Sequence, residues 1–440
     1  MTSVSPPSAS GPASLIGRLA DRYDRHRGGR AVIGWWVVTR LIIIALMSTI
    51  ESFVVGDVFY YWRKTAALWE VGLPSTLNEY PTPVAWILWL PYGLSAGHRV
   101  GYLVAFIALM MVLDGAFCYL LWRMNGRRHD RAIDFWLVFV LLVGPLAYLR
   151  FDLLPAVLAG GALLYARRHP WVTGAFTGLG AAIKLWPALL MPAFLAHRPG
   201  RKDASATFVG VGFGLALLSL LLGGWGRLVS PLTWQSGRGL QIESVWATPL
   251  MILRAIRPHA WVVDISRFQA YEIFGSGVGS MLLLSNLATV VGFVVMIALF
   301  ARGFRTDPSP IAVGLVILSV VAIMVVTNKT LSPQYLLWLG GPMAALLAMK
   351  AELAEDERAL IRRLGKQLVL LALLTHLVYP SLYDGLLGRQ GHVMIIISTV
   401  AVTLRNLALV LFTVEVCRLA WRFLGPEQQK GRHGSVAALR

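Results

Sequence analysis

The chain has 440 residues, of which 57% are hydrophobic and only 14% are charged. Its mean hydropathy of +0.65 is higher than a water-soluble domain can bury in its core, so the composition predicts an all-α polytopic membrane protein. Lys and Arg number 40 against 22 Asp and Glu, which gives a formal charge of +18. In a membrane protein this excess is typical of cytoplasmic loops that face anionic lipid, and no nucleic-acid partner is expected.

The predicted organisation is one transmembrane domain between two polar tails. Residues 1–30 contain much Ser, Pro, Gly and Arg and no apolar stretch, which indicates a disordered cytoplasmic tail rather than a signal peptide. The transmembrane domain covers residues 31–420, with external loops at about 51–99 and 230–275, and a second cytoplasmic tail covers 421–440. Apolar segments are expected at residues 31–50, 82–97, 100–121, 133–149, 152–166, 171–196, 205–229, 278–301, 310–327, 334–349, 367–380 and 393–420.

The orientation of these segments follows from five basic connections, which the positive-inside rule places in the cytoplasm. They lie at residues 123–131, 167–169, 197–202, 302–305 and 350–366. Two segments must then bend back rather than cross as single helices: residues 82–97, which Pro91 interrupts, and residues 171–196, which break at Lys184–Pro187. The resulting topology has about twelve crossings in the plasma membrane, with both termini in the cytoplasm.

This topology places polar residues from six separate connections at the extracytoplasmic face. They are Asp57, Glu79, Arg150, Asp152, Lys184, Arg238, Gln241, Glu243, Asn328, Lys329 and Gln334. Charged and amide groups beside hydrocarbon are costly to keep unless they are hydrated or used. This face is therefore the candidate active site.

Asp57 lies just beyond the first span, at the start of the aromatic stretch GDVFYYW. Aromatic side chains at this density suit a helix that lies in the membrane interface. A carboxylate at such a boundary can accept a proton from a sugar hydroxyl, because partial burial raises its pKa. A helix N-cap or a solvated loop aspartate is the alternative.

Three short segments carry charged residues that are candidates for pairing or ligand binding, and in two of them a lysine is a candidate contact to a phosphate. Arg150 and Asp152 in LRFDLLP lie at the joint between two apolar runs, where they can pair with each other or one can bind a ligand. Lys184 would be an unpaired ammonium near lipid unless an anion meets it, and a phosphate would meet it well. Lys329, in TNKTLSPQYLLW, is the second candidate phosphate contact.

The loop that follows residue 229 contains the polar stretch SGRGLQIESVWATP. Its closely spaced Arg238, Gln241 and Glu243 suit a hydroxyl-rich substrate, whereas an ordered surface loop with internal hydrogen bonds is the alternative. Further candidates for substrate binding are Glu79, Tyr80, Asn328 and Gln334. For Glu79 a capping or solvated role fits equally well.

Other polar residues are expected to be structural. Arg40 and Asp114 lie inside apolar runs, where pairing within the helix bundle is the expected role. Cys118 and Cys417 also lie in apolar runs and the histidines show no ligand spacing, so neither a disulfide nor a metal site is expected. The chain contains no Walker A or dinucleotide-binding motif, so no soluble nucleotide cofactor is expected.

Six motifs in order along the chain resemble glycosyltransferase family 87. They are GDVFYYW, EYPTP, RFDLLP, GLGAAIKLWPALL, RGLQIES and NKTLSPQYLLW. The family has the C-type glycosyltransferase fold and includes mannosyltransferases that use polyprenol-phosphate mannose. The resemblance covers roughly residues 50–340 and is weaker beyond them.

The resemblance implies that Asp57 is the general base that activates the acceptor hydroxyl. The donor would be a polyprenyl-phosphate sugar, most simply mannose, and the acceptor a glycolipid or a cell-envelope glycan. Lys329 and Lys184 would stabilise the leaving phosphate as charge develops on it. No divalent metal is then required, because no diphosphate needs neutralising, and the expected stereochemistry is inversion.

The sequence departs from C-type enzymes that carry paired acidic residues, since Gly56 and Val58 flank Asp57. A single carboxylate still suffices for a base, but whether mannose, arabinose or glucose is transferred stays open. The alternative function is a transporter or flippase of lipid-linked saccharide. Such a protein should carry its site near the membrane midplane between internal repeats, and no repeated half is present here.

Overall fold

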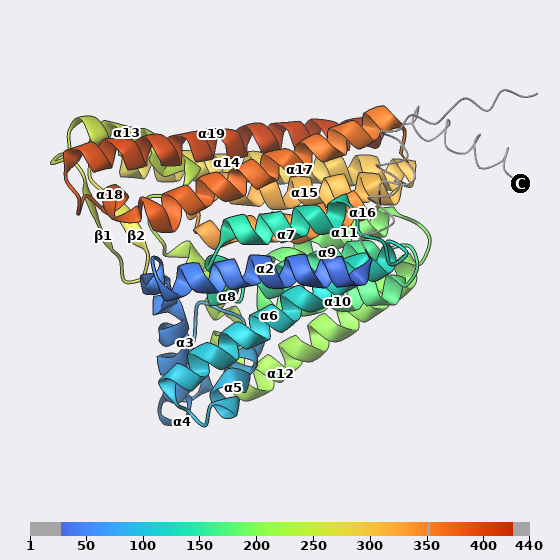
Figure 1. Cartoon of the computed structure of the whole chain (residues 1–440), viewed down its shortest axis with the longest axis horizontal. Coiled ribbons are helices and arrows are strands. Elements are labelled where there is room, and N and C mark those ends of the chain that lie inside the picture. The colour runs from blue at the N-terminus through green and yellow to red at the C-terminus, as the bar shows by residue number, and fades with distance from the viewer. Residues whose placement is uncertain (1–27, 350–352, 426–440) are drawn as a thin grey trace, which may run out of the picture.

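Long helices make up most of the molecule, which the computed structural model describes over residues 28–349 and 353–425. Within these residues six helices are long and apolar enough, by length and composition, to cross a membrane. They are α2 (Gly29–Ser48), α6 (Arg99–Met124), α12 (Arg201–Ser236), α14 (Val278–Thr306), α15 (Pro310–Thr327) and α19 (His392–Phe423). Figure 1 shows α2, α14, α15 and α19 running along the long axis of the molecule. The prediction of a helical, polytopic membrane protein is confirmed.

Twelve further helices, several short helical turns and one hairpin complete the described chain. The helices are α3 (Gly56–Ala66), α4 (Leu68–Val71), α5 (Pro83–Leu94), α7 (Arg131–Val143), α8 (Leu146–Leu149), α9 (Leu153–Tyr165), α10 (Pro170–Ile183), α11 (Met191–Ala196), α13 (Thr248–Ile256), α16 (Leu337–Ala348), α17 (Glu355–His376) and α18 (Tyr383–Leu387). Short 3₁₀ helices lie at η1 (Ser52–Val55), η2 (Leu73–Ser75), η3 (Trp186–Leu190), η4 (Val245–Ala247) and η5 (Pro333–Leu336), and η7 (Leu377–Ser381) is a π-helical turn. The antiparallel strands are β1 (Val262–Ile265) and β2 (Tyr271–Phe274).

Several apolar segments form helices that are too short to cross hydrocarbon alone. Helices α7 and α9 have 13 residues each, which corresponds to about 20 Å against about 30 Å of bilayer core. Gly144 at φ +68°, followed by Pro145, ends α7 before the apolar run is complete. The count of about twelve crossings therefore stays a prediction.

Of the two segments predicted to bend back, only residues 171–196 break where expected. Helix α5 has 12 residues and continues through Pro91 to Leu94, so it is short but not interrupted there. Helix α10 stops at Lys184, whose backbone is extended (φ −140°, ψ 136°), and η3 and α11 follow. By contrast, α12 continues to Ser236, into residues predicted as external loop, after a break at Gly224 with φ +75°. The predicted tails lie almost entirely outside the described residues.

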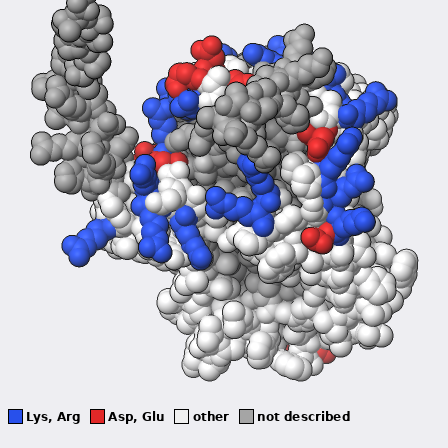
Figure 2. Space-filling model, turned by 90° about the vertical axis from the view of Figure 1, so that its right-hand side faces the viewer, with Lys and Arg blue, Asp and Glu red and all other residues white. Residues whose placement is uncertain are grey.

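The basic connections gather at one end of the molecule. The loops between α6 and α7, between α9 and α10 and between α11 and α12 lie there, and so does the end of α14 (Figures 1 and 2). Hydrogen bonds join two of these connections directly, since the Arg198 amide donates to Asp307 and His197 Nδ1 lies 3.1 Å from the Pro308 carbonyl oxygen. At the other end, α3 lies across the end of α2, near the β1–β2 hairpin (Figure 1).

A buried carboxylate ties the N-terminal helices together. Asp114 on α6 accepts hydrogen bonds from Nε and Nη2 of Arg40 on α2, each at 2.8 Å. It also accepts from the indoles of Trp36 and Trp136 and from the Tyr148 hydroxyl, at 2.7 to 2.8 Å. Arg40 and Asp114 are 1% and 0% exposed, so both charges are compensated inside the protein. The predicted pairing of Arg40 with Asp114 is confirmed.

Replacing Asp114 by Leu should destabilise the fold strongly, because it leaves the buried Arg40 guanidinium without its carboxylate. Breaking such a pair costs about 3–5 kcal/mol. Thermal unfolding in detergent should show a large drop in Tm for Asp114→Leu and little change for Asp264→Leu, which alters an exposed residue of β1. Equal Tm values for the two variants would contradict this role.

Candidate active site

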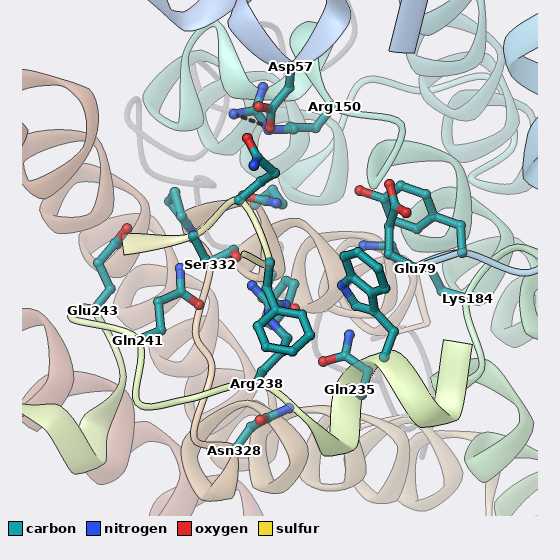
Figure 3. A pocket seen from close by; sticks show the side chains of 18 of the residues that line it. Asp57, Glu79, Arg150, Lys184, Gln235, Arg238, Gln241, Glu243, Asn328 and Ser332 are labelled. Atoms are coloured by element: carbon teal, nitrogen blue, oxygen red, sulfur yellow. Dashed lines mark hydrogen bonds and ion pairs between the residues drawn. The ribbon is translucent and has the colours of Figure 1, made fainter. Parts of the chain in front are cut away.

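A cavity of about 500 Å³ opens at the end of the molecule that carries α3 and the hairpin. This size lies within the usual range for small-molecule sites. Most of the predicted site residues line it: Asp57, Glu79, Tyr80, Arg150, Lys184, Arg238, Gln241, Glu243, Asn328 and Gln334. Asp152 and Lys329 are not among the lining residues. Figure 3 shows side chains from several distant segments pointing into this one space.

Asp57 is held by an ion pair with Arg150. Asp57 lies in the first turn of α3, and its Oδ2 is 2.7 Å from Nη2 of Arg150. The arginine side chain is only 7% exposed, whereas that of Asp57 is 49% exposed. The carboxylate is therefore fixed from behind and still reachable from the cavity (Figure 3). Arg150 pairs with Asp57 and not with Asp152, so the pairing across the turn that the sequence left open does not form.

Lys184 has its own carboxylate partner. Its Nζ lies 2.6 Å from Oδ1 of Asp152, and the Trp338 indole donates to the same oxygen at 2.8 Å. The ammonium also lies 5.2 to 5.7 Å from the ring centroids of Tyr80, Phe151, Tyr335 and Trp338. These contacts compensate a cation that the sequence alone leaves beside lipid. A phosphate that reached Lys184 would share it with Asp152.

The loop that carries Glu79 is fixed from two sides. Glu79 Oε1 accepts a hydrogen bond of 2.7 Å from the Tyr60 hydroxyl on α3. Arg227 on α12, which is 2% exposed, donates to the carbonyl oxygens of Leu77 and Tyr80 at 3.2 and 2.7 Å. Arg227 is a positioning residue that the sequence analysis missed. The available signal was an arginine late in a long apolar run, since such residues usually have a partner or a function.

The segment between α12 and η4 forms another wall. The Gln241 amide N–H donates to the Lys329 carbonyl oxygen at 3.1 Å, and its side chain donates to Ser332 at 3.4 Å. Glu243 is completely buried, and its Oε2 lies 3.3 Å from Nη2 of Arg405 on α19. Figure 3 shows Gln241, Glu243 and Ser332 together on one side of the cavity.

Arg238 and Lys329 form a basic region at the edge of the cavity. Arg238 lines the cavity, whereas the Lys329 ammonium donates to the Ser236 carbonyl oxygen at 2.9 Å. Burial and the neighbouring Arg238 charge lower the pKa of Lys329, while Glu272 opposes that shift. Lys329 thus stands beside a lining cation without lining the cavity itself.

Aromatic side chains that the sequence analysis missed complete the walls. Trp186 stacks on Trp338 with ring centroids 5.2 Å apart, and Tyr335 stacks on Trp338 at 4.1 Å. Tyr379 and Tyr383, from η7 and α18, also line the cavity and contact each other at 4.8 Å. Their only signal in the sequence was the general enrichment of aromatic residues at membrane interfaces.

Metal-binding residues do not cluster in the described part of the chain. Residues 28–349 and 353–425 contain no group of three or more His, Cys, Asp and Glu side chains that could hold an ion. The expectation that the reaction needs no metal stays a prediction.

Glu243 should make the stability of the protein depend on pH. Burial raises the pKa of its carboxyl to about 7 from 4.5, although Arg405 lowers it. The folded protein therefore binds this proton more tightly than the unfolded chain. Its stabilising effect is complete below pH 4.5 and is lost as the pH rises through 7.

The Tm of the wild type in detergent should accordingly fall more steeply between pH 4.5 and 7 than that of Glu243→Gln, which cannot titrate. Glu355→Gln, at a fully exposed residue of α17, is the matched control. Parallel Tm profiles for wild type and Glu243→Gln would contradict the assignment.

Comparison with known proteins identifies the family. The model of glycosyltransferase family 87 matches residues 79–328, which is more than half of the chain. A search of curated proteins returned no match. The matched residues include every lining side chain named above except Asp57, Tyr60, Ser332, Gln334, Tyr335, Trp338, Tyr379 and Tyr383. Most of the lining residues thus lie within the matched range, and the chain belongs to glycosyltransferase family 87.

Proposed function

We propose that this membrane glycosyltransferase moves a hexose, with mannose as the first candidate, from a polyprenyl-phosphate donor to a lipid-linked or cell-envelope glycan acceptor. The reaction takes place at the extracytoplasmic face of the plasma membrane and inverts the anomeric carbon. The observation that carries the proposal is Asp57: a half-exposed carboxylate in a cavity, held by the buried Arg150.

The orientation is supported by the distribution of charge. The basic loops lie at the end opposite to α3 and the hairpin, and Figure 2 shows many Lys and Arg side chains on that end. By the positive-inside rule the basic end faces the cytoplasm, so the cavity faces outward. Cytoplasmic nucleotide sugars would not reach it, whereas a lipid-linked sugar would arrive through the membrane.

The chemistry requires a base for one hydroxyl and a stabilised leaving group. As the acceptor oxygen attacks the anomeric carbon, Asp57 takes the hydroxyl proton. The bond between that carbon and the phosphate oxygen breaks, and polyprenyl phosphate leaves with the electron pair. Arg150 holds one oxygen of Asp57, so the other is presented to the cavity in a fixed position.

Replacing Asp57 by Asn should remove proton transfer while keeping the side-chain shape. Loss of a general base typically lowers the rate about 100- to 10,000-fold. Transfer of labelled mannose from polyprenyl-phosphate mannose, measured in membranes, should fall by this factor for Asp57→Asn but not for Asp264→Asn. Detergent-stable yield checks folding. Equal transfer by wild type and Asp57→Asn would exclude this base, and movement of intact lipid-linked saccharide without transfer would favour a transporter.

Lys329 and Lys184 are proposed to act on the donor phosphate. Lys329→Met should raise the KM for the donor about 10- to 100-fold, the range for a hydrogen bond to a charged group, and raise the KM for the acceptor much less. Lys202→Met, at an exposed lysine near the start of α12, is the matched control. Equal losses for donor and acceptor would count against this role.

A further inference from the structure

Five polar atoms of residues that line the cavity have no hydrogen-bond partner in the described protein, one of them Nε of Arg238. The other four are Nε of Arg150, Nε1 of Trp186, Oε1 of Gln241 and Oε1 of Glu243, on residues that are 0% to 5% exposed. An atom left unsatisfied in this way keeps the full desolvation cost of its group. All four residues line the same cavity, so a ligand bound there is the common source of partners.

The chemistry of these atoms selects the class of ligand. Two of them, on Arg150 and Trp186, can only donate hydrogen bonds, and two, on Gln241 and on Glu243 in its ionised form, accept them. A hydroxyl both donates and accepts, so a polyol can satisfy both kinds. A phosphate monoester anion or a hydrocarbon tail offers Gln241 and Glu243 no suitable donor, and a carboxylate at Glu243 repels phosphate.

Gln241 and Glu243 belong to a segment that is held rigidly. Arg405 and Asn406 of α19 donate to the Glu243 carbonyl oxygen at 2.9 and 3.2 Å. The amide N–H of Ile242 donates to the Tyr271 carbonyl oxygen at 3.2 Å. Atoms on such a fixed segment lose little freedom when a ligand binds, as a selective site requires.

Gln241 and Glu243 line the same cavity as Asp57. Tyr379 and Tyr383 line the cavity together with Asp57 and Glu243. Burial raises the pKa of Tyr379, Arg150 lowers it, and the charges of Asp57 and Glu243 raise it. A ring bound at Gln241 and Glu243 therefore shares one cavity with Asp57.

We propose that Gln241 and Glu243 form an acceptor subsite, which binds two hydroxyls of the sugar or cyclitol ring whose further hydroxyl attacks the donor. The subsite rests on the proposed function, since it takes Asp57 as the base. It assigns the acceptor wall to residues of one segment, which lies beside the basic region at Arg238 and Lys329.

The first test compares acceptor recognition in Gln241→Met and wild type. Acceptors are methyl α-mannopyranoside and its singly deoxygenated analogues, with polyprenyl-phosphate mannose as donor. Wild type should use one analogue about tenfold less well than the parent, because one hydrogen bond is lost. Gln241→Met should raise the acceptor KM about tenfold, leave the donor KM unchanged and no longer discriminate against that analogue. Gln241→Glu, which keeps an accepting oxygen, should restore discrimination.

Gln367→Met is the matched control, because Gln367 bonds Glu415 on α19 rather than lining the cavity. It should discriminate among the analogues as wild type does. A donor KM raised as much as the acceptor KM in Gln241→Met, or unchanged discrimination, would overturn the subsite even if transfer by wild type supports the proposed function.

A second measurement separates the subsite from the reaction. Saturation-transfer NMR with methyl α-mannopyranoside and no donor reports binding to the detergent-purified full chain. Binding by wild type that is weakened in Gln241→Met supports the subsite even where wild type transfers no sugar, in which case only the proposed function fails. Equal binding by the two proteins, or none by wild type, overturns the subsite.

Discussion

Charged side chains near hydrocarbon need partners inside the protein, and this requirement organises the end of the molecule that holds the cavity. Arg150 and Asp152 are two residues apart, yet each pairs with a distant segment: Arg150 with Asp57 and Asp152 with Lys184. The two pairs join α3 and α10 to the short joint between α8 and α9. A helix break that would be costly in lipid thus becomes the point where three segments are fixed together.

The cavity combines parts that are distant in sequence and that buried polar side chains hold in place. Asp114 and its donors lie in the interior between α2, α6 and α7 and fix the helices that lead to the site. Arg227 and Arg405 then reach from the long helices α12 and α19 to backbone carbonyls of the loops that line the cavity. The loops are therefore positioned by the membrane-spanning scaffold, as a precise binding site requires.

The sequence predicts where helices begin and end better than it predicts which side chains pair with each other. Apolar runs, Pro91 and the KLWP break are local signals, and they indicated the short α5 and the interruption at Lys184. The basic loops fixed the predicted orientation of the helices, and this orientation placed Asp57, Glu243 and the other polar residues at one end of the molecule. Arg150 pairs with Asp57 because α3 lies beside the joint between α8 and α9. No local sequence pattern predicts which helices become neighbours in this way. Arg405 was missed for the same reason, because its partner Glu243 is 162 residues away.

The hydrogen bonds from α19 to the segment around Glu243 affect how the acceptor specificity of such a site can change during evolution. Asn406 and one nitrogen of Arg405 hold the carbonyl oxygens of Glu243 and Ser244, which are groups that every amino acid possesses. The path of the backbone is therefore largely independent of the side chain displayed at position 241, whereas the Glu243 side chain also compensates the buried Arg405. Substitutions at position 241 can exchange one recognised hydroxyl for another while the scaffold stays the same, so related enzymes can evolve new acceptors without rebuilding the fold.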